Sequence, residues 1–380
     1  PTSYLENEKK YNVDMKKMED IAKQLSAVFK NYKYLFNTNV KINGNEITSF
    51  RSTSEDVNLK LPHNSVVIKV SATFEDDNRV KTADDLTLQY ENPDEIPSID
   101  ALVERVRKFA DDCMEMRNAP VMEEYYKGPV MYEDEAAKQV ITATYLAPDQ
   151  FYGQQNYTEN PKSLGQKLGK KIIDERISIV NSTDKTEYNG EKLYGHYQVD
   201  ADGFKPEAEL SIVEKGVFKT MLNRTTPAMY AEKSTANSRL ANSPAQSIPL
   251  LGVGTLHVKA DGTTKDDNML KTLLKAAKKQ KLDYAYVVTT PSGYTSLRLY
   301  QVDVKTGERK LVKHNSITLP TESQMKKFAA ISDRPFVSNN VQPYTYSTIT
   351  PASIIVGDAE LTKPVLNSDK ASELVYPLQR

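Results

Sequence analysis

Apolar residues recur at helical spacing in two stretches near the start of the chain. Within residues 14–32, the apolar positions that repeat every three or four residues are Met18, Ile21, Leu25, Val28 and Phe29. The same spacing within residues 98–116 is carried by Leu102, Val106, Phe109, Ala110 and Cys113. This period predicts two amphipathic helices, and Asp14 is a suitable N-terminal cap for the first.

The chain between these helices alternates apolar and polar residues, which is typical of strands. Residues 37–53 contain Asn43-Gly44, which predicts the turn of a β-hairpin. Residues 65–80 predict a strand that turns at Asp76, Asp77 and Asn78. Two helices combined with a hairpin-rich sheet indicate an α+β region that ends near Pro120.

A short strand, a turn and an amphipathic helix are predicted next, in "YKGPVMYEDEAAKQVITATYLAPD" at residues 126–149, with Pro148 ending the helix. The acidic residues Glu133, Asp134 and Glu135 stand at the start of this helix, where carboxylates complement the exposed N–H groups. We therefore interpret them as structural residues rather than as a catalytic carboxylate cluster.

The remaining pattern predicts a β-rich, mainly antiparallel region. Strands are expected at residues 176–182, 194–200, 208–216, 217–223, 252–260, 283–290 and 352–361, with a hairpin at 296–317 and helices near 267–279 and 322–330. Turn signals at Asn189-Gly190, Asp202-Gly203 and Lys215-Gly216 suit a meander, sandwich or barrel. We expect an α+β fold with an N-terminal region at 1–120, truncated at its start, a β-rich region at 121–364 and a tail at 365–380.

Composition excludes only a few classes of function. The net charge of −1 provides no global field that would attract nucleic acid or an anionic membrane. No apolar run reaches the length of about 18 residues that spans a bilayer. The single cysteine, Cys113, cannot form an internal disulfide, and its place on an apolar helix face indicates a structural thiol.

The polar opening "PTSYLENEKKYN" has neither an initiator methionine nor a signal peptide, so we interpret the chain as a fragment of a longer precursor. Its compartment stays open between the cytoplasm and export to the periplasm or cell envelope.

The sequence offers few candidate metal-binding or nucleic-acid-binding residues. Four histidines lack a His, Asp or Glu partner at the spacing of a zinc-binding helix, and we interpret them as surface or turn residues. They are His63, His196, His257 and His314. A basic helix face is interpreted as solvated, with nucleic-acid binding as the alternative. It is formed by Lys271, Lys275, Lys278 and Lys279.

The long polar segment at residues 224–249 leaves two alternatives open. Its length and its Ser, Thr and Asn content suit either a plain disordered loop or a functional loop that contacts a ligand or partner. If it is functional, the candidate residues for peptide or partner contact are Arg224, Asn237 and Arg239.

The order of several motifs resembles the TldD/TldE (PmbA) family, which is related to metallopeptidases and was once labelled modulators of DNA gyrase. The matching stretches are "YKGPVMYEDEAAKQVI", "KSLGQKLGKKIIDERISIVNS", "GHYQVDADGFKPEAELSIVEKGVFKTMLNRTTP" and the C-terminal "ITLPTESQMKKFAAIS…TITPASIIVGDAELTKP". Together they cover roughly residues 36–364. The resemblance implies an α+β N-terminal region followed by a β-rich C-terminal domain.

The same resemblance implies a zinc peptidase whose helix carries H-E-x-x-x-H and whose cysteine ligand lies further along. Such peptidases pair with a non-catalytic sister protein. When the H-E-x-x-x-H motif is aligned with this sequence, its first His falls on Thr142, its Glu on Ala143 and its second His on Ala147. No cysteine follows the helix. Thr and Ala cannot bind zinc as imidazole does, nor can Ala act as the base for a zinc-bound water.

We therefore expect a catalytically inactive member that lacks zinc or any other cofactor. It would serve as the structural or peptide-binding partner of a TldD-like paralogue, or as a homodimer, in peptide proteolysis or maturation. The alternative is a divergent metallopeptidase or amide hydrolase with an unrecognised site. A nucleic-acid-associated protein is a third reading, although no nucleic acid is expected as a partner, because the charge and motifs give it no support.

Overall fold

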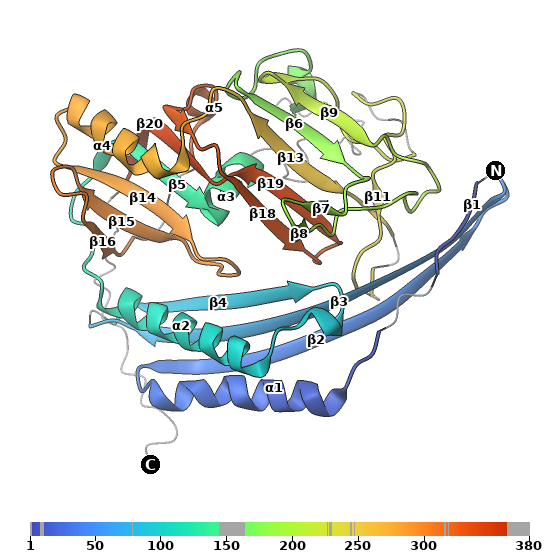
Figure 1. The fold of residues 1–380 in the computed structure, drawn as a ribbon, viewed down its shortest axis with the longest axis horizontal. Helices are drawn as coiled ribbons and strands as arrows, with labels where there is room; N and C mark the ends of the chain where they lie inside the picture. Colours follow the sequence, from blue (N-terminus) through green and yellow to red (C-terminus); the bar gives the residue numbers. More distant parts are fainter. Residues whose placement is uncertain are drawn as a thin grey trace.

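The computed structural model describes residues 2–7, 11–77, 79–143, 164–225, 227, 230–243, 245–246, 248–314, 317 and 319–362. One sheet and two long helices form its N-terminal part (Figure 1). The strands are β1 (Thr2–Leu5), β2 (Leu35–Ser52), β3 (Val57–Glu75) and β4 (Lys81–Tyr90). The helices are α1 (Met15–Val28), η1 (Phe29–Asn31), η2 (Pro93–Glu95) and α2 (Ile99–Asn118).

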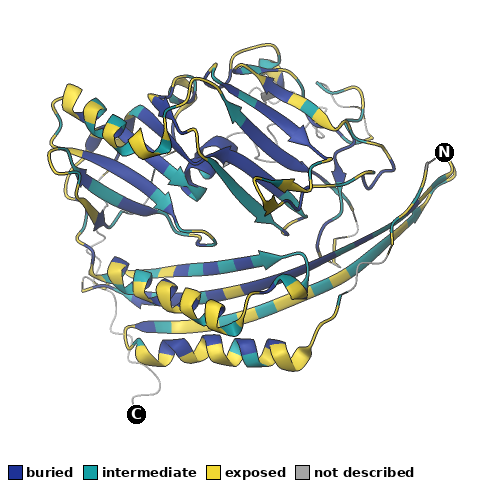
Figure 2. Cartoon of the chain, in the orientation of Figure 1, coloured by how far each residue is buried: buried dark blue, intermediate teal, exposed yellow. Residues whose placement is uncertain are grey.

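Both long helices begin where the sequence predicts, and they bury the residues that were predicted to face a core. Asp14 accepts a hydrogen bond from Lys17 N at 3.1 Å and caps α1, and Ser98 caps α2 by accepting from Ala101 N at 3.3 Å. Their apolar faces form one core with the even-numbered positions of β3, while their outer sides are exposed (Figure 2). Cys113 is fully buried in α2, and burial raises the pKa of its thiol.

The hairpin turn predicted at Asn43-Gly44 is wrong, because β2 runs straight through both residues. The chain reverses later, at residues 53–56, where Asp56 has a φ of +59°. A Cβ at Gly44 would lie 2.3 Å from the hydroxyl at the end of the Tyr11 side chain, so the tyrosine would have to shift if a larger residue stood there. The turn after β3 is confirmed at Asp76 and Asp77, whereas Asn78 lies outside the described residues.

The polar N-terminus contains a strand that the sequence pattern did not predict. β1 pairs in parallel with β3 at Val57–Lys60. β4 pairs with the same edge of β3 at Val66–Glu75, so residues 61–65 face a gap between the two shorter strands.

Two six-stranded sheets make up the C-terminal part, in the orders β10-β9-β6-β13-β19-β18 and β16-β15-β14-β5-β20-β17. The first sheet consists of β6 (Ile177–Ser182), β9 (Glu209–Glu214), β10 (Val217–Phe218), β13 (Thr255–Ala260), β18 (Pro335–Asn340) and β19 (Tyr346–Pro351). The second consists of β5 (Tyr126–Asp134), β14 (Tyr284–Thr290), β15 (Arg298–Asp303), β16 (Arg309–Val312), β17 (Ala330–Ile331) and β20 (Ser353–Leu361). The fold class is α+β, as expected, and the strand pairs are mainly antiparallel.

Small elements complete this part of the chain. Two two-stranded ribbons are formed by β7 (Glu187–Tyr188) with β8 (Glu191–Lys192) and by β11 (Ser238–Arg239) with β12 (Leu250–Leu251). The helices are α3 (Glu135–Ala143), η3 (Leu164–Lys167), η4 (Asp266–Asn268), α4 (Met269–Lys279) and α5 (Glu322–Met325). The buried face of α3 shares one core with both large sheets, between which it lies (Figure 1).

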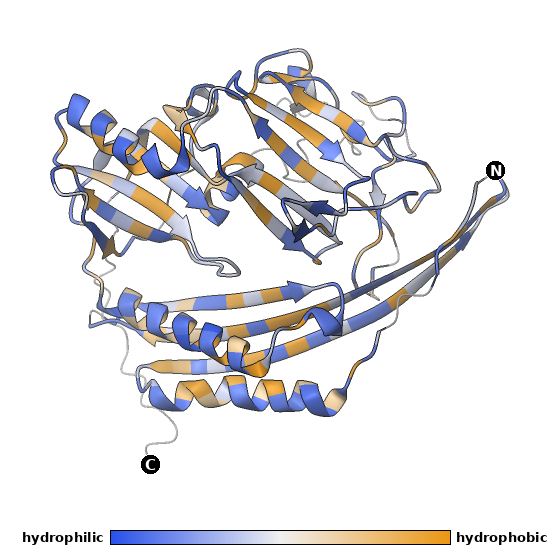
Figure 3. Ribbon diagram, viewed as in Figure 1, coloured by the Kyte–Doolittle hydropathy of each residue, from blue (hydrophilic) through white to orange (hydrophobic). Residues whose placement is uncertain are grey.

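α4 covers the opposite face of the second sheet. The lysines of its outer face are exposed, and the hydropathy colouring shows this side as hydrophilic (Figure 3). No helix among the described residues is both long enough and apolar enough to cross a membrane. The division of the chain into domains stays a prediction.

Several predicted elements in the C-terminal part differ from the structure. Residues 194–200 form no strand, because Tyr194 N and Gly195 N donate to the Ser347 hydroxyl, at 2.7 and 3.2 Å, rather than to a neighbouring strand. α5 ends at Met325 rather than near residue 330, and Phe328 N instead donates to the Asp174 carboxylate at 2.8 Å. The strands β18 and β19 were not predicted.

Candidate functional site

The start of α3 is held by ion pairs. Glu133 and Asp134 end β5 and Glu135 begins α3. Arg309 donates to both carboxylate oxygens of Glu133 at 2.9 Å. Arg334 contacts Asp134 at 2.9 Å, and Lys138 contacts Glu135. Each acid has a basic partner, which favours the structural interpretation of this trio.

The side of α3 that faces β18 carries a lysine and a threonine. Lys138 is buried, and its ammonium donates to the Ser338 hydroxyl at 3.1 Å. Thr142, on which the first His of the family motif falls, is also buried and donates to the Lys138 carbonyl at 2.9 Å. Ala143 ends the described helix, and Ala147 and Pro148 lie outside the described residues.

This donor set does not suit zinc. The hydroxyl of Thr142 is a neutral donor already used by the backbone, and an ammonium repels a divalent cation. Within the described ranges, no three His, Cys, Asp or Glu side chains are grouped so as to hold a metal ion.

Two histidines are more buried than the sequence analysis expected. His257 is only 9 % exposed, since the β7–β8 ribbon places the ring of Tyr188 against it at 5.2 Å. Burial lowers the pKa of His257 to about 4, and the nearby Lys185 and Lys259 act in the same direction. Burial also lowers the pKa of His314. The interpretation of His257 as a surface residue is therefore wrong; His196 is exposed but lies on a loop instead of a strand.

The three residues predicted from the long polar segment occupy different environments. Arg224 contacts the buried carboxylate of Asp202 through Nε and Nη2, both at 3.2 Å, and donates from Nη1 to Pro249 O at 2.8 Å. Arg51 and Thr225 donate to the same carboxylate. Burial by itself raises the pKa of Asp202, but the hydrogen bonds from Arg224, Arg51 and Thr225 together lower it to about 2.

Asn237 is fully buried and holds the backbone of the segment in place. Its amide donates to Gly252 O at 2.9 Å and lies 3.4 Å from the hydroxyl of Tyr197. Asp200 acts similarly, because its carboxylate accepts from the backbone N–H groups of Asp202, Phe204 and Ser238. These contacts show that the described part of the segment is an ordered loop.

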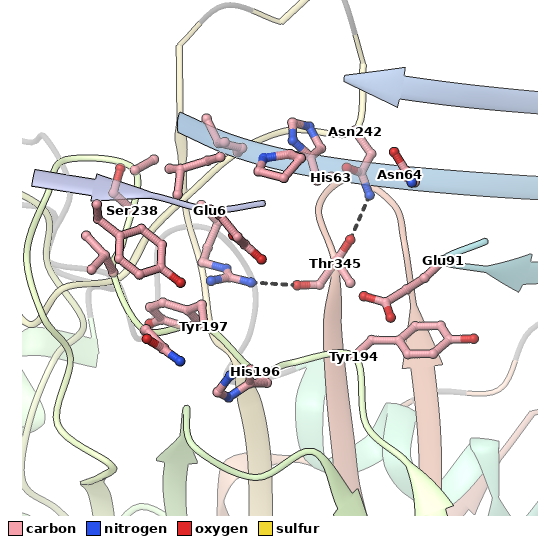
Figure 4. A pocket seen from close by; sticks show the side chains of 18 of the residues that line it. Glu6, His63, Asn64, Glu91, Tyr194, His196, Tyr197, Ser238, Asn242 and Thr345 are labelled. Atoms are coloured by element: carbon pink, nitrogen blue, oxygen red, sulfur yellow. Dashed lines mark hydrogen bonds between the residues drawn. The ribbon is translucent and has the colours of Figure 1, made fainter. Parts of the chain in front are cut away.

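Arg239 lines a cavity of about 130 Å³ between the N-terminal sheet and the C-terminal loops (Figure 4). We call this the Arg239 cavity; its walls include Leu61–Asn64 of β3, Glu91 and Asn92 after β4, Tyr197, Ser238 and Thr345. The guanidinium lies over the ring of Tyr197 at 3.8 Å. It donates from Nη2 to Thr345 O at 3.0 Å. Arg239 is thus the one predicted residue of the three that lines this cavity.

A second hollow of about 410 Å³ lies between β4 and β18. This β4–β18 cleft is walled by Thr87–Tyr90, Ser292–Thr295 and Phe336–Asn340, and Glu135 of α3 reaches it. β18 is the terminal strand of its sheet, and among the strands that the structure describes it pairs with β19 alone. The cleft therefore places a strand edge next to the helix on which the family motif falls.

Sequence reasoning missed Tyr197, Ser238 and Thr345 as cavity residues. Tyr197 had an available signal, because it lies in "YGHYQVDADG", a segment rich in aromatic residues directly before a turn. Thr345 had none, since it enters the cavity from a turn between two strands that were not predicted.

The model of the PmbA/TldA metallopeptidase C-terminal domain matches residues 126–363, more than half of the 380-residue chain. No curated protein matches the chain.

Three solved structures are similar to this one. A Thermotoga maritima protein, named as a proposed modulator of a DNA gyrase, has a TM-score of 0.64 at 16% identity and covers 94% of this chain and 78% of its own. A Bacteroides thetaiotaomicron protein with a similar name has a TM-score of 0.59 at 13% identity and covers 93% and 72%. TldE from Thermococcus kodakarensis has a TM-score of 0.53 at 15% identity and covers 94% and 79%. These likenesses show a shared fold, and with the domain match they establish that the chain belongs to the TldD/PmbA family.

Proposed function

We propose that this family member is a non-catalytic, peptide-binding protein that acts as the partner of a zinc-bearing relative or as a homodimer. The observation that carries the proposal is the side of α3 facing β18, where Lys138 and Thr142 stand. A peptidase of this family type needs neutral imidazoles and a general base at this place, and an ammonium with a hydroxyl supplies neither function.

The β4–β18 cleft supports the peptide-binding part of the proposal. An extended peptide binds readily to an exposed strand edge, because its backbone completes the hydrogen bonds that the edge leaves open. β18 offers such an edge, and β4 with residues 292–295 forms the opposite wall. Backbone recognition of this kind is tolerant of sequence, which suits a protein that handles unstructured peptides.

Metal analysis of the purified protein tests the non-catalytic part. We expect far less than one zinc ion per chain after purification in zinc-containing buffer, and no cleavage of an unstructured peptide. Stoichiometric zinc that a chelator removes together with peptidase activity would contradict the proposal. That result would favour the alternative of a divergent metallopeptidase or amide hydrolase.

Peptide binding is tested with a fluorescently labelled unstructured peptide and two variants of Val337, which lines the cleft on β18. Val337→Trp fills the cleft and should weaken binding at least tenfold, whereas Val337→Thr keeps the size of the side chain and should bind as the wild type does. Thermal unfolding of both variants shows whether either is misfolded. Equal affinity of a folded Val337→Trp variant would exclude the cleft as the binding site.

The partner is tested by co-purification. A tagged form of this protein expressed with a TldD-like relative that carries H-E-x-x-x-H should retain that relative through gel filtration. Elution of this protein as a symmetric dimer without the relative would favour the homodimer.

A further inference from the structure

We propose that the Arg239 cavity binds a carboxylate, with the guanidinium of Arg239 as its counter-ion. The nearest source of such a group is the C-terminus of a bound peptide, which rests on the function proposed above. A free small amino acid presents the same group and is the other source.

Arg239 differs from the other arginines of similar burial because no carboxylate pairs with it in the described part of the chain. Within the described residues, each other buried or half-buried arginine has a carboxylate within 4 Å. These are Arg51, Arg117, Arg176, Arg224 and Arg298. Arg239 has a ring face and one carbonyl instead. Glu6 and Glu91 also line the cavity, but Glu91 pairs with Lys192 and neither carboxylate forms an ion pair with Arg239 among the described residues. Because a half-buried charge without a counter-ion is unfavourable, a ligand carboxylate would stabilise Arg239.

The guanidinium of Arg239 has more N–H donors than its contacts in the described part of the chain use. A guanidinium carries five N–H donors, and Thr345 O accepts from Nη2. Nε is buried with no partner in the described part of the chain. Ser238 is only 1 % exposed, and its hydroxyl likewise has no partner among the described residues. The Ser238 hydroxyl and Arg239 Nε are both shielded from the cavity, so a carboxylate would bind through the remaining N–H groups on Nη1 and Nη2 of Arg239.

The geometry of Arg239 is preorganised. The ring of Tyr197 supports the guanidinium from one face, and the Tyr197 hydroxyl is itself fixed by donation to Ala236 O at 2.8 Å. Thr345 is fixed by Asn242, whose amide donates to its hydroxyl at 2.8 Å (Figure 4). A planar guanidinium held in this manner loses little entropy on binding a carboxylate, and its fork matches the two oxygens.

The volume limits the ligand to a small group. A cavity of about 150 Å³ accommodates benzene in a well-studied protein, so about 130 Å³ accepts a carboxylate with a few further atoms. This is the size of one terminal residue. The cleft and the cavity are near each other along the chain, since Tyr90 lines the cleft while Glu91 and Asn92 line the cavity.

Calorimetric titration of the whole protein separates the possibilities. The probes are an N-acetylated alanine peptide with a free C-terminus, the same peptide as its C-terminal amide, free alanine, and acetate. We expect the acid to bind the wild type at least tenfold more tightly than the amide, because hydrogen bonds to charged groups are stronger by about this factor. Arg239→Gln should abolish the preference, and Arg239→Lys should retain part of it.

Lys205→Gln is the matched control, because it removes the same charge at an exposed position away from the cavity and should leave the preference unchanged. Equal affinity for acid and amide overturns the inference, as does a preference that survives in Arg239→Gln. Peptide binding that Val337→Trp weakens, with no acid preference, leaves the proposed function standing and removes only this inference. Binding of alanine or acetate through Arg239 without peptide binding identifies the free amino acid as the source. No binding of any probe overturns the inference.

Discussion

Two arginines from the C-terminal part meet the N-terminal sheet at opposite ends of β4, and they differ in what surrounds them. Near its start, Arg298 contacts Asp84 at 2.5 Å, with both side chains almost fully buried. Beyond its end, Arg239 lines a cavity without a carboxylate partner. Arginine thus forms a buried ion pair at one contact between the two parts of the structure, whereas at the other contact its charge has no carboxylate partner among the described residues. The difference indicates that one arginine acts in stability and the other in binding.

The contact between Arg298 and Asp84 is accompanied by several further hydrogen bonds. Asp84 also accepts from Ser296 N at 3.2 Å and from the Thr295 hydroxyl at 3.3 Å. Residues 293 and 295 pair with the backbone of β4 through Thr87 N to Gly293 O at 2.7 Å and Thr295 N to Asp85 O at 3.1 Å. Because these polar groups pair with one another, the loss of one member leaves its partner without a hydrogen bond.

The largest effect is expected when Arg298 is replaced by Ala. The buried Asp84 carboxylate would lose its counter-ion, and such a change costs about 3–5 kcal/mol of folding free energy. Urea unfolding measures the loss. The double variant Asp84→Leu with Arg298→Met should recover most of it, since it leaves no charge unpaired. A loss below about 1 kcal/mol would mean that the pair does not hold the junction.

An intermediate effect is expected at Asp202, which pairs with Arg224 and Arg51. Its pKa is lowered in the folded state from 3.8 to about 2, so the stabilisation is fully present above pH about 4 and is lost as the pH falls towards 2. A shift of this size corresponds to about 2 kcal/mol.

Urea unfolding between pH 2 and 6 tests this by the difference between the wild type and Asp202→Asn. The difference should be constant at higher pH and shrink below about pH 4, because protonation makes the Asp202 carboxyl group neutral, as the Asn side chain is throughout. Glu187→Gln, at an exposed carboxylate without an ion pair in the described part of the chain, is the control and should show a small difference throughout. A pH-independent difference for Asp202→Asn would argue against the ion pairs as its cause.

The smallest effect on stability is expected for Arg239→Gln, below about 1 kcal/mol. The variant loses one hydrogen bond and a contact with the ring of Tyr197, but it also removes a charge that no carboxylate balances. Unfolding of this variant beside Arg298→Gln compares the two arginines directly. Losses of equal size would show that Arg239 is a structural residue like Arg298.

The sequence predicted the helical parts of the fold best. α1 and α2 combine a regular apolar repeat with a capping residue, and both signals are local. Asn43-Gly44 failed as a turn because β2 runs through both residues, although the dipeptide alone favours a reversal of the chain. β18 and β19 were missed because half of their residues are Ser, Thr or Asn and two more are Pro, and because the strands are stabilised by pairing with distant segments.

The candidate site was predictable only in part. The long polar segment drew attention to Arg224 and Arg239 equally, because both are arginines in the same kind of sequence. What distinguishes them is the partner, Asp202 for one and the ring of Tyr197 for the other. Those partners are set by tertiary packing. Likewise, the burial of His257 depends on the β7–β8 ribbon that covers it, which the alternation of β13 cannot reveal.

The placement of the two junctions on β4 has a mechanical consequence. A rotation of the C-terminal part against the N-terminal sheet would pivot where Asp84 and Arg298 hold, and would change the width of the structure most at the far end, where the cavity lies. A small carboxylate bound in the cavity would therefore lie at the end of the structure where such a rotation moves the two parts most.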